Sequence, residues 1–184
     1  MESSASGSSD EVRFKRILVP TDFSEGAEHA LEYAICLSGF YHAEIVLLHV
    51  FDLPEYLSLL SEKAGLDSEA PERVLEAAKK RAVEKLQDIV RPLADKEPVI
   101  IIFLAIGVPF EEIVRVAAEW DVELIVMSTH GRTGLAHFLL GSITERVVSH
   151  AACPVLVVNQ KKDKAGPPHR ARSTHQNWSC APRR

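Results

Sequence analysis

The sequence lacks the residue patterns that mark several common protein classes. Its 184 residues include only three cysteines, Cys36, Cys153 and Cys180, with neither the CxxC pairs of a metal site nor the spacing of a disulfide framework. A membrane-spanning helix needs about 20 apolar residues, and no apolar stretch approaches that length. The N-terminus has no charged start followed by an apolar block, so it does not resemble a secretory signal. These absences predict a protein of the reducing cytoplasm with no membrane segment.

Several catalytic and binding motifs are also missing. There is no GxxxxGK[ST] loop with a lysine placed to reach terminal phosphates, and no GxGxxG follows the first apolar segment. The eight histidines show no HxH, HExxH or CxxH spacing, which argues against a zinc site. No GxSxG elbow surrounds Ser128 or His130, so a hydrolytic triad is not expected.

Charge is distributed unevenly along the chain. Residues 161–184 hold seven of the basic residues against one acidic residue, although the whole chain has a net charge of -5. The remaining chain is therefore acidic, which argues against nonspecific binding of nucleic acid by the domain. We predict a disordered N-terminal extension over 1–12, one folded domain over 13–160, and a basic, disordered tail over 161–184.

Two hydrophobic periodicities alternate in the central region. Continuous apolar runs predict strands, and stripes at helical spacing predict helices. The expected strands are Phe14–Pro20, Glu44–Val50, Val99–Ala105, Leu124–Ser128 and Pro154–Val158, and the expected helices are Ser24–Phe40, Pro71–Ala94, Pro109–Trp120 and Ser142–His150. Residues 51–69 are expected to be irregular and could be a lid or a linker.

The alternation predicts an α/β fold with an open five-stranded parallel sheet and helices on both faces. Ligands of such sheets bind at the carboxyl ends of the strands, where the winding direction reverses. The residues after strands one and four, Pro20-Thr21-Asp22 and Ser128 to Ser142, form the expected site if these strands are neighbours. Periodicity alone does not establish that strand order.

A glycine-containing segment after the fourth strand could hold phosphate. It reads Ser128-Thr129-His130-Gly131-Arg132, and then Gly141-Ser142-Ile143-Thr144 opens a helix. A helix start exposes unpaired N–H groups, and Arg132, Ser142 and Thr144 could add donors. A simpler interpretation is equally open, because Ser142 and Glu145 have capping-box spacing and the glycines could shape a turn. Asp22 or Ser24 could likewise cap the first helix.

Together these residues resemble the universal stress protein family, and in particular its ATP-binding branch. The resemblance covers about residues 14–158 and rests on three parts. They are Ile17 to Ser24 at the first strand, Leu47-Leu48-His49-Val50 at the second, and the nucleotide signature G-x-x-G, nine residues, G-[ST]. The signature reads here from Ser128 through Gly131 to Gly141-Ser142, with Ser128 in place of its first glycine.

The resemblance implies the strand order 3-2-1-4-5, which makes strands one and four neighbours. It implies that Pro20, Thr21 and Asp22 line the adenosine side and that the Val50 backbone meets the adenine edge. It implies that ribose and phosphates lie against the segments Met127-Ser128-Thr129-His130-Gly131-Arg132 and Gly141-Ser142-Ile143-Thr144. ATP (or AMP or ADP) with Mg or Mn on the phosphates is the expected cofactor. A homodimer through the last strand, Pro154 to Val158, is expected as well, since that apolar edge would otherwise be exposed.

Three functions are compatible with the sequence. The first is a cytoplasmic ATP-binding stress protein that acts as a nucleotide-dependent switch or as a module for an unidentified protein partner. The second is a slow ATPase in which His130 or Asp22 orients water and Arg132 stabilises phosphate charge. The third is a dimeric member that binds no nucleotide because Ser128 closes the site.

Overall fold

The computed structural model describes residues 13–52, 70–93, 98–129 and 140–159. Strands and helices alternate along the chain: β1 (Arg16–Pro20), α1 (Glu25–Tyr41), β2 (Glu44–Asp52), α3 (Ala70–Val90) with a 3-10 turn (Arg91–Leu93), β3 (Ile100–Gly107), α4 (Pro109–Glu119), β4 (Leu124–Ser128), α5 (Ser142–His150) and β5 (Val155–Val158). The predicted terminal extensions, and most of the segment 51–69, lie outside the described residues.

All five strands form one parallel sheet with the order β3-β2-β1-β4-β5. Strand β1 pairs with β2 over its full length and with β4 through Ile17 opposite Leu124 and Leu18 opposite Ile125. The predicted strand order and fold class are therefore confirmed. The strand β2 is longer than predicted, because it continues through Phe51 and Asp52, which pair with Ile106 and Gly107 of β3.

The ends of α1 show why this helix begins and stops where it does. The hydroxyl of Ser24 accepts a hydrogen bond from the N–H of Ala27 at 3.3 Å, which satisfies one free donor of the first turn. Glu25 and Glu28 place negative charge near the positive end of the helix dipole. His42 adopts a left-handed conformation with φ of 53° and ends the helix.

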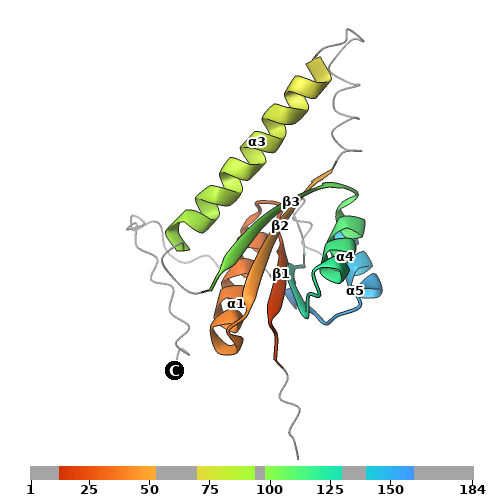
Figure 1. The fold of residues 1–184 in the computed structure, drawn as a ribbon. Helices are drawn as coiled ribbons and strands as arrows, with labels where there is room; N and C mark the ends of the chain where they lie inside the picture. Colours follow the sequence, from red (N-terminus) through yellow and green to blue (C-terminus); the bar gives the residue numbers. More distant parts are fainter. Residues whose placement is uncertain (1–12, 53–69, 94–97, 130–139, 160–184) are drawn as a thin grey trace, which may run out of the picture.

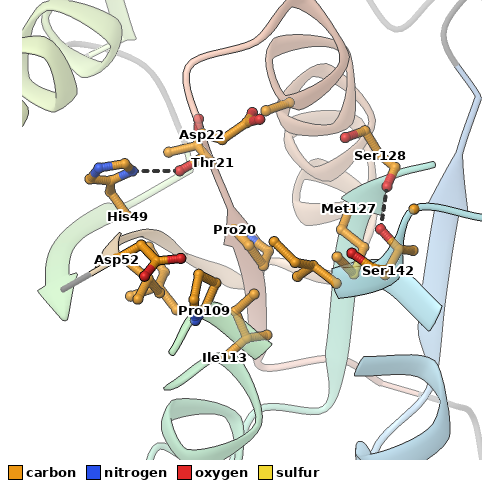
Figure 2. A pocket seen from close by; sticks show the side chains of 16 residues that line it. Pro20, Thr21, Asp22, His49, Asp52, Pro109, Ile113, Met127, Ser128 and Ser142 are labelled. Carbon is orange, nitrogen blue, oxygen red and sulfur yellow. Dashed lines mark hydrogen bonds between the residues drawn. The ribbon is translucent and has the colours of Figure 1, made fainter. Parts of the chain in front are cut away.

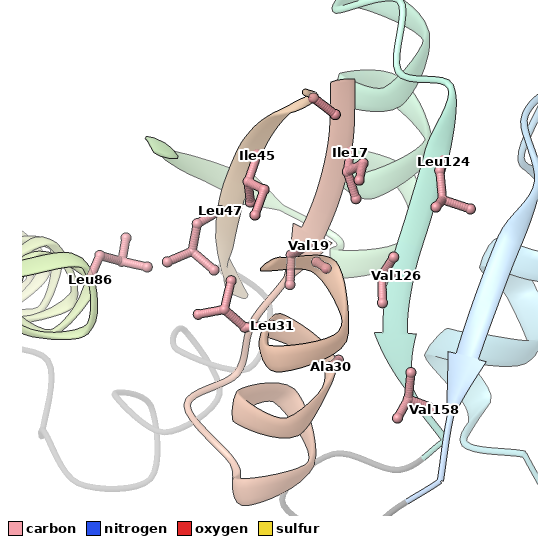
Figure 3. Close-up of a cluster of buried hydrophobic side chains, with 12 residues drawn as sticks. Ile17, Val19, Ala30, Leu31, Ile45, Leu47, Leu86, Leu124, Val126 and Val158 are labelled. Atoms are coloured by element: carbon pink, nitrogen blue, oxygen red, sulfur yellow. The ribbon is translucent and has the colours of Figure 1, made fainter. Parts of the chain in front are cut away.

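Helices cover both faces of the sheet (Figure 1). On one face, α1 and α3 enclose an apolar cluster with the strands, and Figure 3 shows Leu31 and Leu86 meeting Leu47 there. On the other face, α4 and α5 pack through Ile113, Val116 and Val147 on Leu18, Val46 and Ile125. Burial from two sides explains why the strands read as continuous apolar runs.

Two further features of the fold concern membrane-spanning helices and cysteine pairing. No described helix is long and apolar enough to cross a membrane. Cys36 is partly buried on α1 and is disulfide-bonded, whereas Cys153 is a free thiol. No disulfide was expected from the cysteine spacing, and that expectation was wrong for Cys36, because spacing alone does not reveal pairing.

Candidate functional site

A pocket of about 420 Å³ opens at the carboxyl ends of β2, β1 and β4 (Figure 2). The starts of α4 and α5 close it from the side. Its described lining comprises Pro20, Thr21, Asp22, Ala27, Leu48, His49, Val50, Asp52, Pro109, Ile113, Met127, Ser128, Gly141, Ser142, Ile143 and Thr144. The pocket therefore lies where an open α/β sheet binds its ligand, beside the strand at which the winding reverses.

The loop after β1 is held by backbone and side-chain hydrogen bonds. The N–H of Thr21 donates to the carbonyl of Leu48 at 2.7 Å, which extends the pairing of β1 with β2. Oδ1 of Asp22 accepts from both the N–H and the hydroxyl of Ser24, at 3.1 and 2.6 Å. Ser24 is thus the N-cap of α1, and Asp22 supports that cap while it also lines the pocket. Capping and ligand contact are compatible at this position.

Phe23 occupies an unusual backbone conformation in the same loop. Its φ is 65°, in the left-handed region that a bulky side chain rarely adopts. Its ring lies 4.3 Å, centroid to centroid, from the imidazole of His49, and Nζ of Lys85 on α3 lies 5.1 Å above the ring. These contacts on the side chain offset the local strain and hold the loop against α3.

His49 also fixes the position of Thr21. Its Nδ1 lies 2.7 Å from the carbonyl oxygen of Thr21 (Figure 2), so Nδ1 carries the proton and donates. The histidine therefore positions the backbone of the pocket wall. The sequence analysis assigned His49 no role of its own, because its hydrogen bond joins residues 28 positions apart.

The N-terminus of α5 faces the pocket without a side-chain cap. Gly141 is the N-cap residue, with φ of -60° and ψ of 146°, and among the described residues no side chain caps the first turn. Ser142 is therefore the first helical residue, so the capping-box interpretation of Ser142 and Glu145 is wrong. Free backbone N–H groups and the positive end of the helix dipole make this end of α5 suitable for an anion.

The α5 start is tied to the end of β4 by two hydrogen bonds. The hydroxyl of Thr144 donates to the carbonyl of Ser128 at 3.0 Å, and the N–H of Gly141 donates to the carbonyl of Thr129 at 2.8 Å. Thr144 is buried, with 4% of its surface exposed. The sequence analysis expected the Thr144 hydroxyl to donate to a phosphate. In the structure this hydroxyl donates to Ser128 instead, so only the backbone N–H of Thr144 could bind a phosphate.

Most of the predicted site residues lie together. Nine line the described pocket besides Thr144: Pro20, Thr21, Asp22, Val50, Met127, Ser128, Gly141, Ser142 and Ile143. Thr129 is not in the lining; its N–H donates to the carbonyl of Val158 at 3.0 Å, and it braces the loop. The predicted residues His130, Gly131 and Arg132 lie outside the described residues.

Six lining residues were not predicted from the sequence: Ala27, Leu48, His49, Asp52, Pro109 and Ile113. Asp52 is the last residue of β2 and Pro109 follows the end of β3, so the rule that ligands bind at strand ends could have indicated them. Asp52 was missed because it was placed in the irregular segment. Ile113 was missed because one turn of a helix separates it from the strand end.

Solved structures with the same fold include nucleotide complexes. The chain resembles the structure of MJ0577 at 36% identity and a TM-score of 0.71, over 82% of this chain and 99% of that one. An Arabidopsis thaliana family protein with AMP bound shares the fold at 18% identity and a TM-score of 0.56, over 81% and 94% of the two chains. A universal stress protein in complex with cAMP shares it at 20% identity and 0.51, over 80% and 98%.

Sequence comparison leads to the same family. Universal stress protein MJ0577 of Methanocaldococcus jannaschii is 39% identical over 158 residues, which cover 82% of this chain and 98% of that protein. Universal stress protein MJ0531 of the same organism is 35% identical over 81% of this chain and 84% of its own length. The sequence profile of the Universal stress protein family matches residues 13–159. The chain belongs to the universal stress protein family.

Proposed function

We propose that this protein binds ATP in the pocket above β1 and β4 and acts in the cytoplasm as a nucleotide-dependent stress-response switch or partner-binding module. The observation that carries the proposal is the start of α5 in the pocket lining, at the carboxyl edge of the sheet, where the N-cap residue Gly141 has no side chain to cap the first turn. Phosphate oxygens are the natural acceptors for such a helix start.

The rest of the pocket suits a nucleoside. Its volume of about 420 Å³ falls in the range of small-molecule sites. Pro20, Val50 and Met127 offer apolar surface for a base, and the Ser142 hydroxyl adds a polar group at the phosphate end. The AMP and cAMP complexes of proteins with this fold support a nucleotide as the ligand class.

A divalent cation, Mg or Mn, is expected to accompany the phosphates. Within the described part of the chain, no group of three or more His, Cys, Asp or Glu residues could hold a metal ion. The cation would therefore depend on phosphate oxygens, with the Ser142 hydroxyl and the Asp22 carboxylate as nearby oxygen donors. Its role would be to neutralise phosphate charge that the lining residues do not neutralise.

Calorimetry with ATP, ADP and AMP, each with and without Mg²⁺ or Mn²⁺, tests the proposal directly. We expect ATP with a cation to bind and the Ser142→Asp variant to bind it at least about tenfold more weakly, because the new carboxylate repels phosphate at the helix start. Ser149→Asp is the matched control, since it adds the same charge at the far end of the same exposed helix surface. Absence of binding at millimolar ATP, or equal binding by the Ser142→Asp variant, would refute the proposal.

A phosphate-release assay separates nucleotide binding from ATP hydrolysis. Among the described lining residues none is Lys or Arg, and the Nδ1 proton of His49 is engaged by Thr21. We therefore propose binding without efficient hydrolysis. Release of phosphate well above the rate in buffer over several hours would identify an ATPase instead. Nucleotide retained through purification would argue against a member that binds none.

We further propose a homodimer through β5. This strand is at the edge of the sheet, next to β4 only, and Leu156 is 37% exposed on it. An exposed apolar edge strand favours pairing with a second copy. Sedimentation should show a dimer for the native chain and a monomer for Leu156→Lys, while Val99→Lys, beside the opposite edge strand β3, should leave the dimer intact. A native monomer would exclude this assembly.

A further inference from the structure

A row of side chains on α1 lies on the side of the helix away from the core. His29, Tyr33, Cys36 and Phe40 follow one another at intervals of three or four residues, which places them along one side of the helix. Tyr33 is 44% exposed and Phe40 is 74% exposed, and the imidazole of His29 lies 5.1 Å from the Tyr33 ring, centroid to centroid. This outer stripe of α1 is therefore a partly aromatic surface that is open to a partner.

The cysteine in the middle of the outer stripe is already paired. Cys36 is disulfide-bonded. Cys153 is a free thiol, and the sequence contains only one other cysteine, Cys180. A disulfide within one chain therefore joins Cys36 to Cys180, which belongs to the basic tail.

The chain leaves the folded domain beside α1. Val158, at the end of β5, packs in the same buried cluster as Ala30 and Ala34 of α1, and Figure 3 shows Val158 below Ala30. Asn159 follows it and is the last residue that the structure describes. The chain from Asn159 to Cys180 could span up to about 70 Å if fully extended, whereas the 17 residues of α1 extend over about 26 Å. Every part of α1 is thus within reach of Cys180.

The tail and α1 carry opposite charges. The helix contains Glu25, Glu28 and Glu32 and neither Lys nor Arg, whereas residues 161–184 hold seven basic residues and one acidic residue. Glu25 and Glu32 lie next to the outer stripe, because each stands four residues before one of its members. The tail also contains Trp178, an aromatic side chain close in sequence to the cysteine that is joined to α1. Charge and aromatic content therefore both match the tail to this side of α1.

From these observations we infer that residues 161–184 dock on the outer stripe of α1, where a reversible disulfide between Cys36 and Cys180 locks them under oxidising conditions. Trp178 packs against the exposed ring of Phe40, and the basic residues lie along the glutamates of the helix. Disulfides of cytoplasmic proteins are usually transient or redox-sensing, so reduction releases the tail and uncovers the stripe. This redox-controlled contact goes beyond nucleotide binding and does not depend on it.

A small-molecule disulfide such as oxidised glutathione is the oxidant. The thiolate of Cys36 or Cys180 attacks it, which breaks the glutathione disulfide, forms a mixed disulfide and releases one glutathione thiolate. The second cysteine then attacks the protein sulfur of the mixed disulfide and releases the other glutathione. The two protein thiols thereby lose two electrons and two protons, and two glutathione thiols gain them. Docking of the tail favours this exchange, because it raises the effective concentration of one cysteine at the other.

Peptide mapping of the full chain tests the pairing. The protein is equilibrated over a range of ratios of reduced to oxidised glutathione, quenched with acid, alkylated in denaturant and digested with trypsin without reduction. Mass spectrometry should find the peptide of residues 17–63 linked to that of residues 173–183, with Cys153 alkylated, in protein that runs as a monomer on a denaturing gel. A link between two chains, a link to Cys153, or no link at any ratio would overturn the inference.

A surface substitution tests whether the tail docks or is merely tethered. Phe40→Lys removes the most exposed ring of the stripe and repels the basic tail, so the equilibrium constant for disulfide formation with glutathione should fall at least about fivefold. Val148→Lys is the matched control, because it changes a side chain 46% exposed on α5, which packs on the other face of the sheet, and it should keep the native constant. Equal constants for the native protein and Phe40→Lys would overturn docking on this stripe.

Discussion

The hydroxyl of Thr144 donates a hydrogen bond to the backbone carbonyl of Ser128, across 16 residues of sequence and over 3.0 Å in space. Thr144 lies in the first turn of α5, and Ser128 is the last residue of β4. The bond is buried, and it holds the open start of the helix over the end of the strand. The orientation of the proposed phosphate site therefore depends on one side chain that no longer has a proton to offer a ligand.

Thr144→Val should lower both stability and nucleotide affinity. Valine keeps the shape of threonine but removes the buried donor, which should cost about 1–3 kcal/mol of unfolding free energy. Ser149→Ala is the matched control, because its hydroxyl also donates to a backbone carbonyl, that of Glu145, but on an exposed surface. Urea denaturation of both variants measures the difference. A Thr144→Val protein as stable as the native one would show that the bond does not anchor α5.

Gly107→Ala should destabilise the connection between β3 and α4. Gly107 has φ of 154°, a conformation that a side chain opposes, and an added Cβ would meet Cγ and Oε1 of Glu112 at 3.0 Å. We expect a loss of about 1–3 kcal/mol. Gly39→Ala is the control and should raise the free energy of unfolding. Nothing lies within 4 Å of the Cβ position at this residue in α1, and helix propensity favours alanine. Thermal unfolding should place the two variants on either side of the native protein.

Leu86→Ala should show that α3 belongs to the core of the domain. Leu86 is fully buried in the cluster that contains Leu31 and Leu47. Truncation should leave a cavity and cost about 2–5 kcal/mol. Leu140→Ala, at a side chain 37% exposed, should have a much smaller effect. If Leu86→Ala unfolded at the native denaturant midpoint, α3 would not contribute to the stability of the sheet.

Cys153 should react slowly with alkylating reagents at neutral pH. Burial raises the pKa of its thiol, because the thiolate is the form that loses hydration. The reactive thiolate is therefore scarcer at pH 7 than in a free thiol, and its fraction should still rise at pH values above those at which a free thiol has ionised. Iodoacetamide labelling followed by mass spectrometry of the Cys153 peptide gives the rate, with glutathione and the denatured protein as references. A native rate equal to that of glutathione would contradict the shielding.

Much of the architecture could be predicted from local sequence. The bounds of β4 and α5 agree with the prediction, and α1, α4 and β1 agree within two residues, because apolar periodicity and Pro109 are local signals. The end of β2 was placed too early, since Phe51 and Asp52 belong to the strand through pairing with β3. Pairing is a contact between distant segments, which periodicity along one segment does not contain.

The candidate site, too, was predicted in part from the sequence and in part only seen in the structure. Glycine and hydroxyl residues after β1 and β4 identified its two main walls, and the resemblance to a family supplied the strand order that brings them together. The sequence left open whether Ser142 caps α5, and only the structure decided this, by placing the N-cap at Gly141. The same holds for His49, whose partner Thr21 is 28 residues away.

The sequence by itself determined the order of strands and helices, the parallel sheet buried on both faces, and the family. These follow from the spacing of apolar residues and from short motifs, both of which are local properties of the chain. The tertiary structure decided which polar groups are committed and which face the pocket: Thr144 to Ser128, Asp22 to Ser24, and the start of α5 left open. Hydrogen-bond partners depend on distances between segments far apart in sequence, and those distances exist only once the chain has folded.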